Sequence, residues 1–177
     1  VRLIDHMGDD QSVVRAARVS VHGLNDVDPD DQRVTGLINY LMKSRHGSPF
    51  ESGLMTFYVK APIFVFREFH RHRIASYNEL SGRYSTLPGD FYLPSPVRPL
   101  VNTGSSARPE FSPGSHEQFE RFCDRAQALY EHAWEAYQQS LADGVANEMA
   151  RIVLPVGIFS QMYVTMNLRS LMNFLSL

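Results

Sequence analysis

Arginines and histidines crowd one short stretch of the chain, from residue 67 to residue 83. This stretch lies between the apolar run 63–66 and the aromatic Tyr84, so part of its charge is expected to approach the core. A buried guanidinium is costly unless it is paired. The partner could be an anionic ligand or an internal salt-bridge network, and the residues alone leave both open. The charged side chains of the stretch are Arg67, Glu68, His70, Arg71, His72, Arg73, Glu79 and Arg83.

Small hydrogen-bonding side chains follow this basic cluster directly. Ser76, Asn78 and Ser81 supply hydroxyl and amide groups, and Gly82 allows a ligand to approach the backbone closely. Glu79 could accept a hydrogen bond from a ligand hydroxyl or orient a neighbouring guanidinium. The segment therefore has the residue types of a site for a phosphate-type anion.

Metal and thiol chemistry fit the sequence poorly. His70 and His72 are two residues apart, a spacing that suits metal ligands on a strand but not on a helix, and the flanking arginines would repel a dication. Cys123 falls in an apolar helical stripe with no paired base, which is typical of a buried small hydrophobe. There is no glycine-rich dinucleotide fingerprint and no P-loop. We expect no metal site and no cysteine nucleophile, and a nucleotide held by side chains and other backbone groups.

Composition narrows the class of protein. The chain has 177 residues, is 44% hydrophobic and carries a formal net charge of −2, so no global basic field favours nucleic acid. Of its 17 basic residues, 15 are arginine. A single cysteine excludes an intrachain disulfide and suits a reducing, cytoplasmic location. The N-terminal residues do not resemble a signal peptide, and Pro155 and Gly157 interrupt the longest apolar stretch, so no membrane span is predicted.

Hydrophobic periodicity predicts a mixed α+β chain that forms a single domain over residues 1–177, without internal repeats. Asp10 or Ser12 is the expected cap of the first helix, and Asn167 that of the last. Two irregular segments are expected at 24–33 and 86–115, the second with a short strand at 90–93. The expected helices span 10–20, 31–45, 62 to about 71, 115–142, 147–154 and 167–177. The expected strands span 54–60 and 157–166.

Residues 71–81 also carry a resemblance to a known family. Arg71-His72-Arg73, seven residues and Ser81 match the signature of the flavin-dependent thymidylate synthases. Four further blocks resemble that family in its order, so that nearly the whole chain is covered. They are HGSPFE at 46–51, KAPIFVFRE at 60–68, ARIVLP at 150–155 and NLRSLMNFL at 167–175.

The resemblance implies an antiparallel sheet flanked by helices and an enzyme that makes dTMP from dUMP. Methylenetetrahydrofolate would give the one-carbon unit, and reduced FAD, regenerated by NADPH, the hydride. The family needs no cysteine nucleophile, in agreement with the independent interpretation of Cys123. It works as a homotetramer whose active sites are shared between subunits.

The site residues that the resemblance implies fall into two sets. Arg83 and Arg151 would contact the phosphate and ring of dUMP, and Ser81 would position the nucleotide; these three are the candidate catalytic residues. The implied flavin set is His46, Ser48, Arg71, His72, Arg73, Glu79, Asn167, Arg169 and Asn173. The implied nucleotide set is Glu68, Arg71, Glu79, Leu80, Ser81, Gly82, Arg83 and Arg151.

Three departures and two rival functions accompany this interpretation. Glu68 stands where many members have Gln, and Ser52, where many have His, receives no role. The family continues past the position of Leu177 to a nucleotide-contacting arginine, so the C-terminus is expected to be incomplete. The rivals are a flavoprotein reductase without methyl transfer and a non-enzymatic nucleotide- or RNA-binding module built on the arginine cluster.

Overall fold

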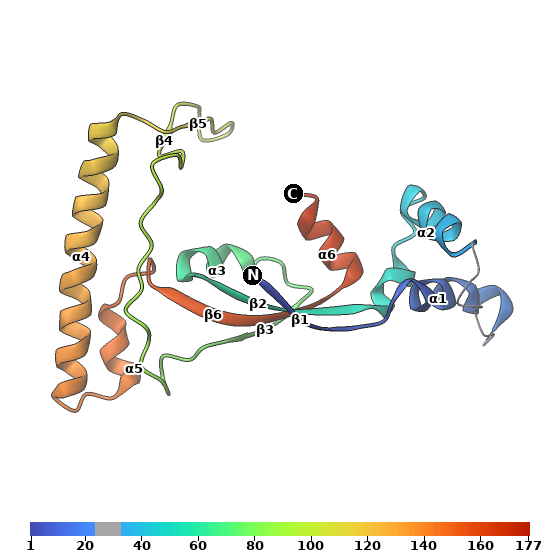
Figure 1. Ribbon diagram of the computed structural model, residues 1–177, viewed down its shortest axis with the longest axis horizontal. Coiled ribbons are helices and arrows are strands. Elements are labelled where there is room, and N and C mark those ends of the chain that lie inside the picture. The colour runs from blue at the N-terminus through green and yellow to red at the C-terminus, as the bar shows by residue number, and fades with distance from the viewer. Residues whose placement is uncertain (24–32) are drawn as a thin grey trace. The chain divides into compact units, whose positions relative to one another are not determined.

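The computed structural model describes residues 1–23 and 33–177, which form two compact units (Figure 1). Unit 1 comprises residues 1–60, 66–79 and 161–177, and unit 2 comprises residues 61–65 and 80–160. Unit 2 is therefore inserted into the sequence of unit 1, in two pieces. The irregular segment predicted at 24–33 lies, apart from Arg33, outside the described residues.

A four-stranded sheet in the order β1-β2-β6-β3 provides the scaffold. Its edge strands are antiparallel to their neighbours, with Arg2 opposite Tyr58 and Tyr77 opposite Val164. The alternation of β6 buries every second side chain, including Met162 and Val164, which is the pattern of a strand with one face in the core. The predicted α+β class with an antiparallel sheet is confirmed. The strands are β1 (Arg2–Met7), β2 (Leu54–Pro62), β3 (Ser76–Glu79) and β6 (Phe159–Asn167).

Helices of unit 1 pack around a small apolar core formed by Val13, Leu41 and Phe50. The first helix is capped by Asp9, not by Asp10 or Ser12. Ser12 is instead the third helical residue of a capping box, in which its backbone N–H donates to Asp9 and its hydroxyl accepts from the backbone of Asp9. These elements are α1 (Asp10–His22), α2 (Arg33–Lys43), the 3₁₀ turn η1 (Ser48–Ser52) and α6 (Leu168–Leu175); η1 contacts both α1 and α6.

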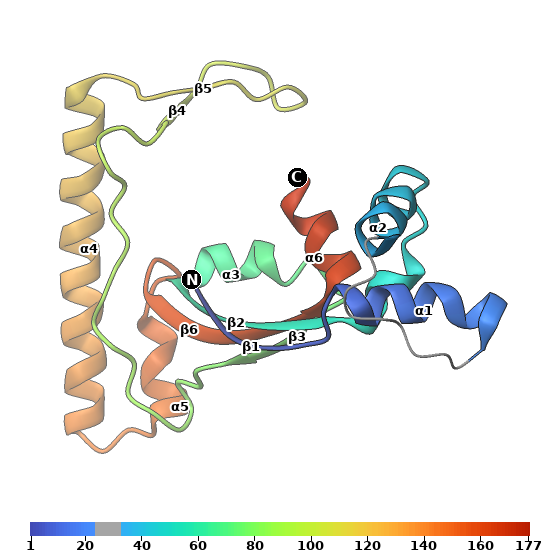
Figure 2. The ribbon, with the colours of Figure 1, turned by 45° about the vertical axis from the view of Figure 1, so that its right-hand side comes forward.

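Unit 2 is organised by the long helix α4 (His116–Ala142), which Ser115 caps. The irregular segment that precedes it runs along this helix (Figure 2), where Phe91 stacks on Tyr130 with ring centroids 4.8 Å apart. Tyr137 is fully buried, and its hydroxyl accepts a hydrogen bond from the backbone N–H of Leu87. The helix therefore serves as the support for a segment that has almost no regular structure of its own.

Several predicted boundaries differ from those observed. The strand expected at 90–93 is only an isolated bridge between Phe91 and Ile158, and a two-stranded ribbon forms further along. The helix expected at 147–154 is a single turn followed by a 3₁₀ turn, and Leu154, which precedes Pro155, is extended with ψ 126°. The remaining elements are α3 (Ile63–Phe69), β4 (Val101–Asn102), β5 (Phe111–Ser112), α5 (Asn147–Ala150) and η2 (Arg151–Val153).

Candidate active site

The Arg71–Arg73 segment follows directly on the end of α3. Its first residue lies in a turn that the backbone N–H of His72 closes by donating to the carbonyl of Phe69, at 3.1 Å. The side chains of Arg71 and Arg73 are exposed, and no ion pair of the described residues involves either. The expectation that part of this charge approaches the core fails for these two arginines, whose side chains lie in solvent, whereas His70 and His72 are half-buried. Two unpaired cations are thus available to an anion.

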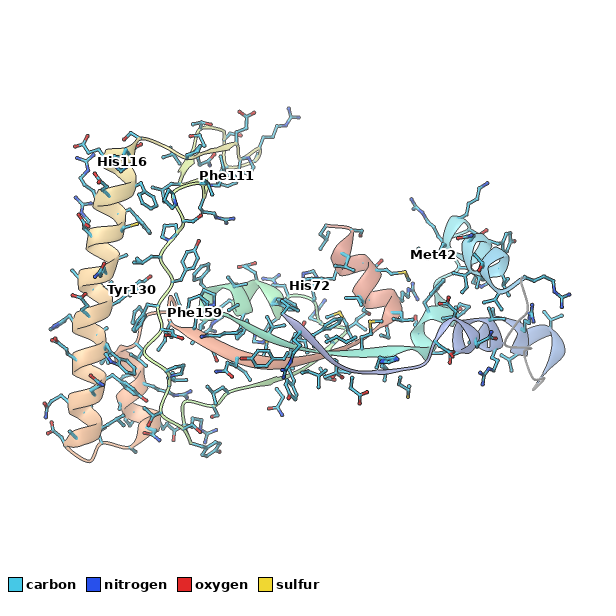
Figure 3. All side chains as sticks on the ribbon, viewed as in Figure 1. Met42, His72, Phe111, His116, Tyr130 and Phe159 are labelled. Carbon is cyan, nitrogen blue, oxygen red and sulfur yellow. The ribbon has the colours of Figure 1, made fainter. Side chains whose placement is uncertain are left out.

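Aromatic rings pack against the Arg71–Arg73 segment and its neighbours. The rings of His72 and of Phe174 in α6 pack in a T-shaped arrangement, with their centroids 4.8 Å apart. Figure 3 shows the labelled His72 next to that helix. Phe174 also packs on Phe69, and Tyr77 packs on both Phe69 and His70. The hydroxyl of Tyr77 lies 2.6 Å from the carbonyl oxygen of His72 and 3.0 Å from that of Phe69. Burial raises the pKa of this hydroxyl above its ordinary value.

The end of α2 positions His46. The N–H of His46 donates to the carbonyl of Leu41 and that of Arg45 to Met42, a Schellman ending in which Arg45 takes the left-handed conformation, with φ 53°. A non-glycine residue at such an angle is uncommon and costs conformational energy. The strained turn directs the chain into Gly47 and η1, and it leaves the His46 side chain exposed.

His46 lines two cavities of unit 1. The larger, of about 840 Å³, lies between α1, α2 and η1, and its walls include Arg18, Ser20 and Ser48. The smaller, of about 450 Å³, is lined by residues that include Arg45, Arg169 and Asn173. Volumes of this size are typical of cofactor and substrate sites. The structure thus gathers four residues of the implied flavin set around the end of α2.

Arg169 and Asn167 are held by specific contacts at the start of α6. The guanidinium of Arg169 donates to the carboxylate of Glu51, and its stem lies against Gly47, where an added Cβ would come within 2.9 Å of Nε. The side-chain oxygen of Asn167 accepts from the N–H of Ser170, which confirms the predicted cap. Its amide NH₂ group remains available to a ligand.

The Ser81–Arg83 segment, in unit 2, is a compact turn. The N–H groups of Tyr84 and Ser85 donate to the carbonyl of Ser81, and the hydroxyl of Ser81 accepts from the N–H of Arg83 at 3.3 Å. No histidine or carboxylate of the described residues hydrogen-bonds to this hydroxyl, so it has no base that would make it a nucleophile.

Two arginines of the implied nucleotide set meet around this turn. A Cβ at the buried Gly82 would lie 3.2 Å from the Cδ of Arg151, so glycine allows the arginine stem to pack on the backbone. Arg83 pairs with Glu148, Nε to Oε1 at 3.2 Å, and its guanidinium lies 5.2 Å from the ring centroid of Tyr84. Its side chain is 49% exposed, so the pair stands in solvent and is weak.

The remaining implied nucleotide residues divide between the two units. Glu68 is exposed in the last turn of α3, and Glu79 ends β3 opposite Met162; both belong to unit 1 with Arg71. Leu80 begins the portion of unit 2 that continues into the Ser81–Arg83 segment.

Several residues near the site were not predicted from the sequence. Tyr77 is visible in the sequence as an aromatic residue interleaved with the arginine cluster, but its hydrogen bonds to Phe69 and His72 were not predicted. Glu148 pairs with an arginine distant in sequence, and no local pattern marks it. Arg18 and Ser20 on α1 had only a weak signal in the sequence. They follow Ala16 and Ala17, whose small side chains leave room beside the helix and line the same cavity.

Two kinds of feature are absent from the described residues. Among the described residues no three histidine, cysteine, aspartate or glutamate side chains cluster as metal ligands would. Within the same residues, none of the helices combines the length and the apolar character needed to cross a bilayer.

Comparison with known proteins places these features in a family. The family model described as thymidylate synthase complementing protein matches residues 2–177. The chain belongs to this family. It is 52% identical over its full length to the flavin-dependent thymidylate synthase of Streptomyces avermitilis and 46% identical to that of Thermotoga neapolitana, and it covers 74% of each of these relatives.

Solved structures support the same membership in the thymidylate synthase complementing family. A UMP/dUMP methylase from Streptomyces cacaoi bound with 5-bromo-UMP superimposes with a TM-score of 0.88 at 44% identity, covering 99% of this chain and 74% of the other. The same methylase bound with 5-bromo-dUMP gives a TM-score of 0.86 at 45% identity, covering 99% of this chain and 76% of the other. The fold resemblance and the sequence resemblance therefore agree over the whole chain.

Proposed function

We propose that this protein is a flavin-dependent thymidylate synthase, which methylates carbon 5 of dUMP to give dTMP. The observation that carries the proposal is the family match over residues 2–177, with relatives of that name at 44–52% identity. The solved methylase bound with 5-bromo-dUMP supports a uracil nucleotide as the substrate.

FAD fits the residues that unit 1 offers. Its diphosphate needs cations without competing partners, and Arg71 and Arg73 have no ion pair among the described residues. The cavity beside His46 and Ser48 is large enough for a sizeable part of the cofactor. When bound and reduced, the flavin supplies the hydride. In this proposal Arg169 and Asn173, which line the neighbouring cavity with His46, complete the polar contacts.

The nucleotide contacts would come from the turn in unit 2. Arg83 and Arg151 offer two guanidiniums next to one short turn, which suits a phosphate and a ring carbonyl. The Ser81 hydroxyl, already accepting from the N–H of Arg83, can still donate a hydrogen bond to the nucleotide. We assign it to positioning.

Chemically, the protein has to make carbon 5 of the uracil ring nucleophilic. Positive charge beside the ring carbonyls stabilises enolate-like character, and a preorganised guanidinium provides it without forming a bond to carbon 6. Cys123, the one cysteine, lies half-buried in α4 and has no hydrogen-bonded base among the described residues. The orientation of the reactants and the local field are therefore the contributions of the chain.

The finer assignments extend this proposal. Methylenetetrahydrofolate is the one-carbon donor and NADPH the reductant, and carbon 5 loses a proton as it gains the methylene group that the hydride converts to methyl. Both units belong to one catalytic domain over residues 1–177. The enzyme is a cytoplasmic homotetramer; exposed apolar side chains such as Phe122, Leu129 and Ile152 support burial against partner subunits.

Tritium release from 5-tritiated dUMP tests the proposal. The purified protein should take up FAD and release tritium only when methylenetetrahydrofolate and NADPH are both present. NADPH oxidation without tritium release would instead support a flavoprotein reductase. A colourless protein that takes up no FAD but binds RNA would support the non-enzymatic module, against which the net charge of −2 already argues.

A further inference from the structure

The turn that carries Arg71 is fastened by a tyrosine from another element. The backbone bond from the N–H of His72 to the carbonyl of Phe69 closes this turn at 3.1 Å. The hydroxyl of Tyr77 lies within hydrogen-bond distance of the carbonyl oxygens at both ends of the same turn, 3.0 Å from Phe69 and 2.6 Å from His72. A single hydroxyl hydrogen is thus shared between two acceptors, with the shorter contact to His72.

Strand pairing and ring packing both hold Tyr77 in position. Tyr77 lies in β3 and pairs with Val164 of β6, whose side chain is 1% exposed. Its ring packs edge-on against Phe69 and His70, with centroids 6.2 Å and 4.8 Å away. Burial raises the pKa of the hydroxyl, so it remains a donor throughout the neutral range.

From this geometry we infer that Tyr77 is a positioning residue for flavin binding, which sets the backbone of the Arg71–Arg73 segment through its hydroxyl. The inference rests on the proposed function, because it takes this segment to hold FAD. The hydrogen bond to the His72 carbonyl fixes the peptide plane between His72 and Arg73, and the contact to Phe69 fixes the entry to the turn. Arg71 lies between these two points and Arg73 directly follows the second, so the hydroxyl sets the backbone from which both guanidiniums extend.

The position of these bonds explains why they matter for affinity. Arg71 and Arg73 have no acidic partners in the described part of the chain, so no ion pair orients them before the ligand arrives. A preorganised backbone lowers the ordering cost that binding would otherwise incur. Among the described residues the Tyr77 hydroxyl makes no hydrogen bond to an arginine, and its effect is therefore transmitted through the main chain.

Tyr77→Phe tests the inference, because it removes the hydroxyl and keeps the ring. The matched control is Tyr163→Phe on the neighbouring strand, where the exposed hydroxyl has no hydrogen bond among the described residues. The dissociation constant of FAD, measured by fluorescence titration of the flavin-free protein, should rise roughly three- to ten-fold in Tyr77→Phe. It should not change in Tyr163→Phe.

Two further measurements separate positioning from a general loss of structure. At saturating FAD the kcat of Tyr77→Phe should return to within about two-fold of the unmodified protein, with only the apparent KM for FAD raised. An unchanged FAD dissociation constant, or a kcat that added FAD does not restore, would overturn the inference. If the unmodified protein bound no FAD, the proposed function itself would fail, which is a distinct result.

Discussion

Two arginine-bearing turns, close in sequence, prepare their cations in different ways. In the Arg71–Arg73 segment of unit 1 the guanidiniums have no ion pairs among the described residues, and the backbone is held instead, by Tyr77 and by the ring of Phe174. In the Ser81–Arg83 segment of unit 2 the side chain itself is held, because Arg83 pairs with Glu148 and lies over Tyr84.

This difference has a consequence for the two proposed ligands. An anion that binds Arg71 and Arg73 displaces only water, so its affinity depends on how well the turn is preorganised. A nucleotide phosphate that binds Arg83 has to compete with the carboxylate of Glu148, so its affinity depends on a charge balance. The first site should respond to changes in the backbone support, and the second to changes in neighbouring charges.

Arg83→Ala is expected to have the largest effect and tests whether nucleotide binding is confined to the second turn. Loss of a charged hydrogen bond should weaken dUMP binding by roughly 1.5–3 kcal/mol, or about 10- to 150-fold. Isothermal titration with 5-bromo-dUMP would measure it, while FAD affinity stays near that of the unmodified protein. Arg121→Ala, which removes an arginine from another exposed pair of unit 2, is the control. Equal nucleotide affinity in both variants would reject the assignment of Arg83.

Arg73→Ala should give the opposite pattern. FAD affinity is expected to fall by about 1–1.5 kcal/mol, less than for Arg83 because Arg71 remains to contact the same diphosphate. Flavin fluorescence titration measures this loss, and dUMP affinity should be retained. Arg2→Ala, on the edge strand of the same unit, controls for the removal of a positive charge. A variant that lost both ligands equally would remove the distinction between the two turns.

Glu148→Gln sharpens the comparison, because it changes only the charge next to Arg83. Without the competing carboxylate, dUMP should bind roughly two- to five-fold more tightly, in line with the small free energy of an exposed ion pair. The salt dependence of nucleotide binding, measured between low and physiological ionic strength, should change with it. Glu117→Gln, on α4 and paired with Arg121, should have no such effect. Weaker binding in Glu148→Gln would mean that the carboxylate orients Arg83 and does not compete.

Cys123→Ser is expected to have the smallest effect. The residue lies in α4, away from either turn in sequence, so tritium release should stay close to that of the unmodified protein, with a stability loss of about 1 kcal/mol from the added polarity. Thermal unfolding and the tritium assay measure the two quantities. Complete loss of activity in a folded variant would place the chemistry in α4 and set aside the comparison of the two turns.

The sequence predicted elements whose signals are local. The apolar stripe of α4 and the Asn167 cap are read from neighbouring residues, and both elements form where expected. Not all of the predicted α4 stripe is covered, since Phe122 and Leu129 stay exposed.

Elements decided by distant partners were missed. The strand Arg2–Met7 is exposed at every residue, so it has no alternating burial pattern, and only its pairing with β2 makes it a strand. The strand Ser76–Glu79 is short and polar, and its pairing with β6 defines it. For the site, residue types indicated the two turns, whereas the contacts of Tyr77 and Glu148 arise from tertiary packing and could not be predicted.

The pairing of β3 with β6 also constrains how the protein matures on the ribosome. Tyr77 is synthesised early, but the strand that fixes it, through Val164, emerges only after all of residues 80–160. Closing so long a loop is slow, because its entropic cost precedes any gain from contact. The turn that presents Arg71 should therefore be among the last parts of the nascent chain to take its final form.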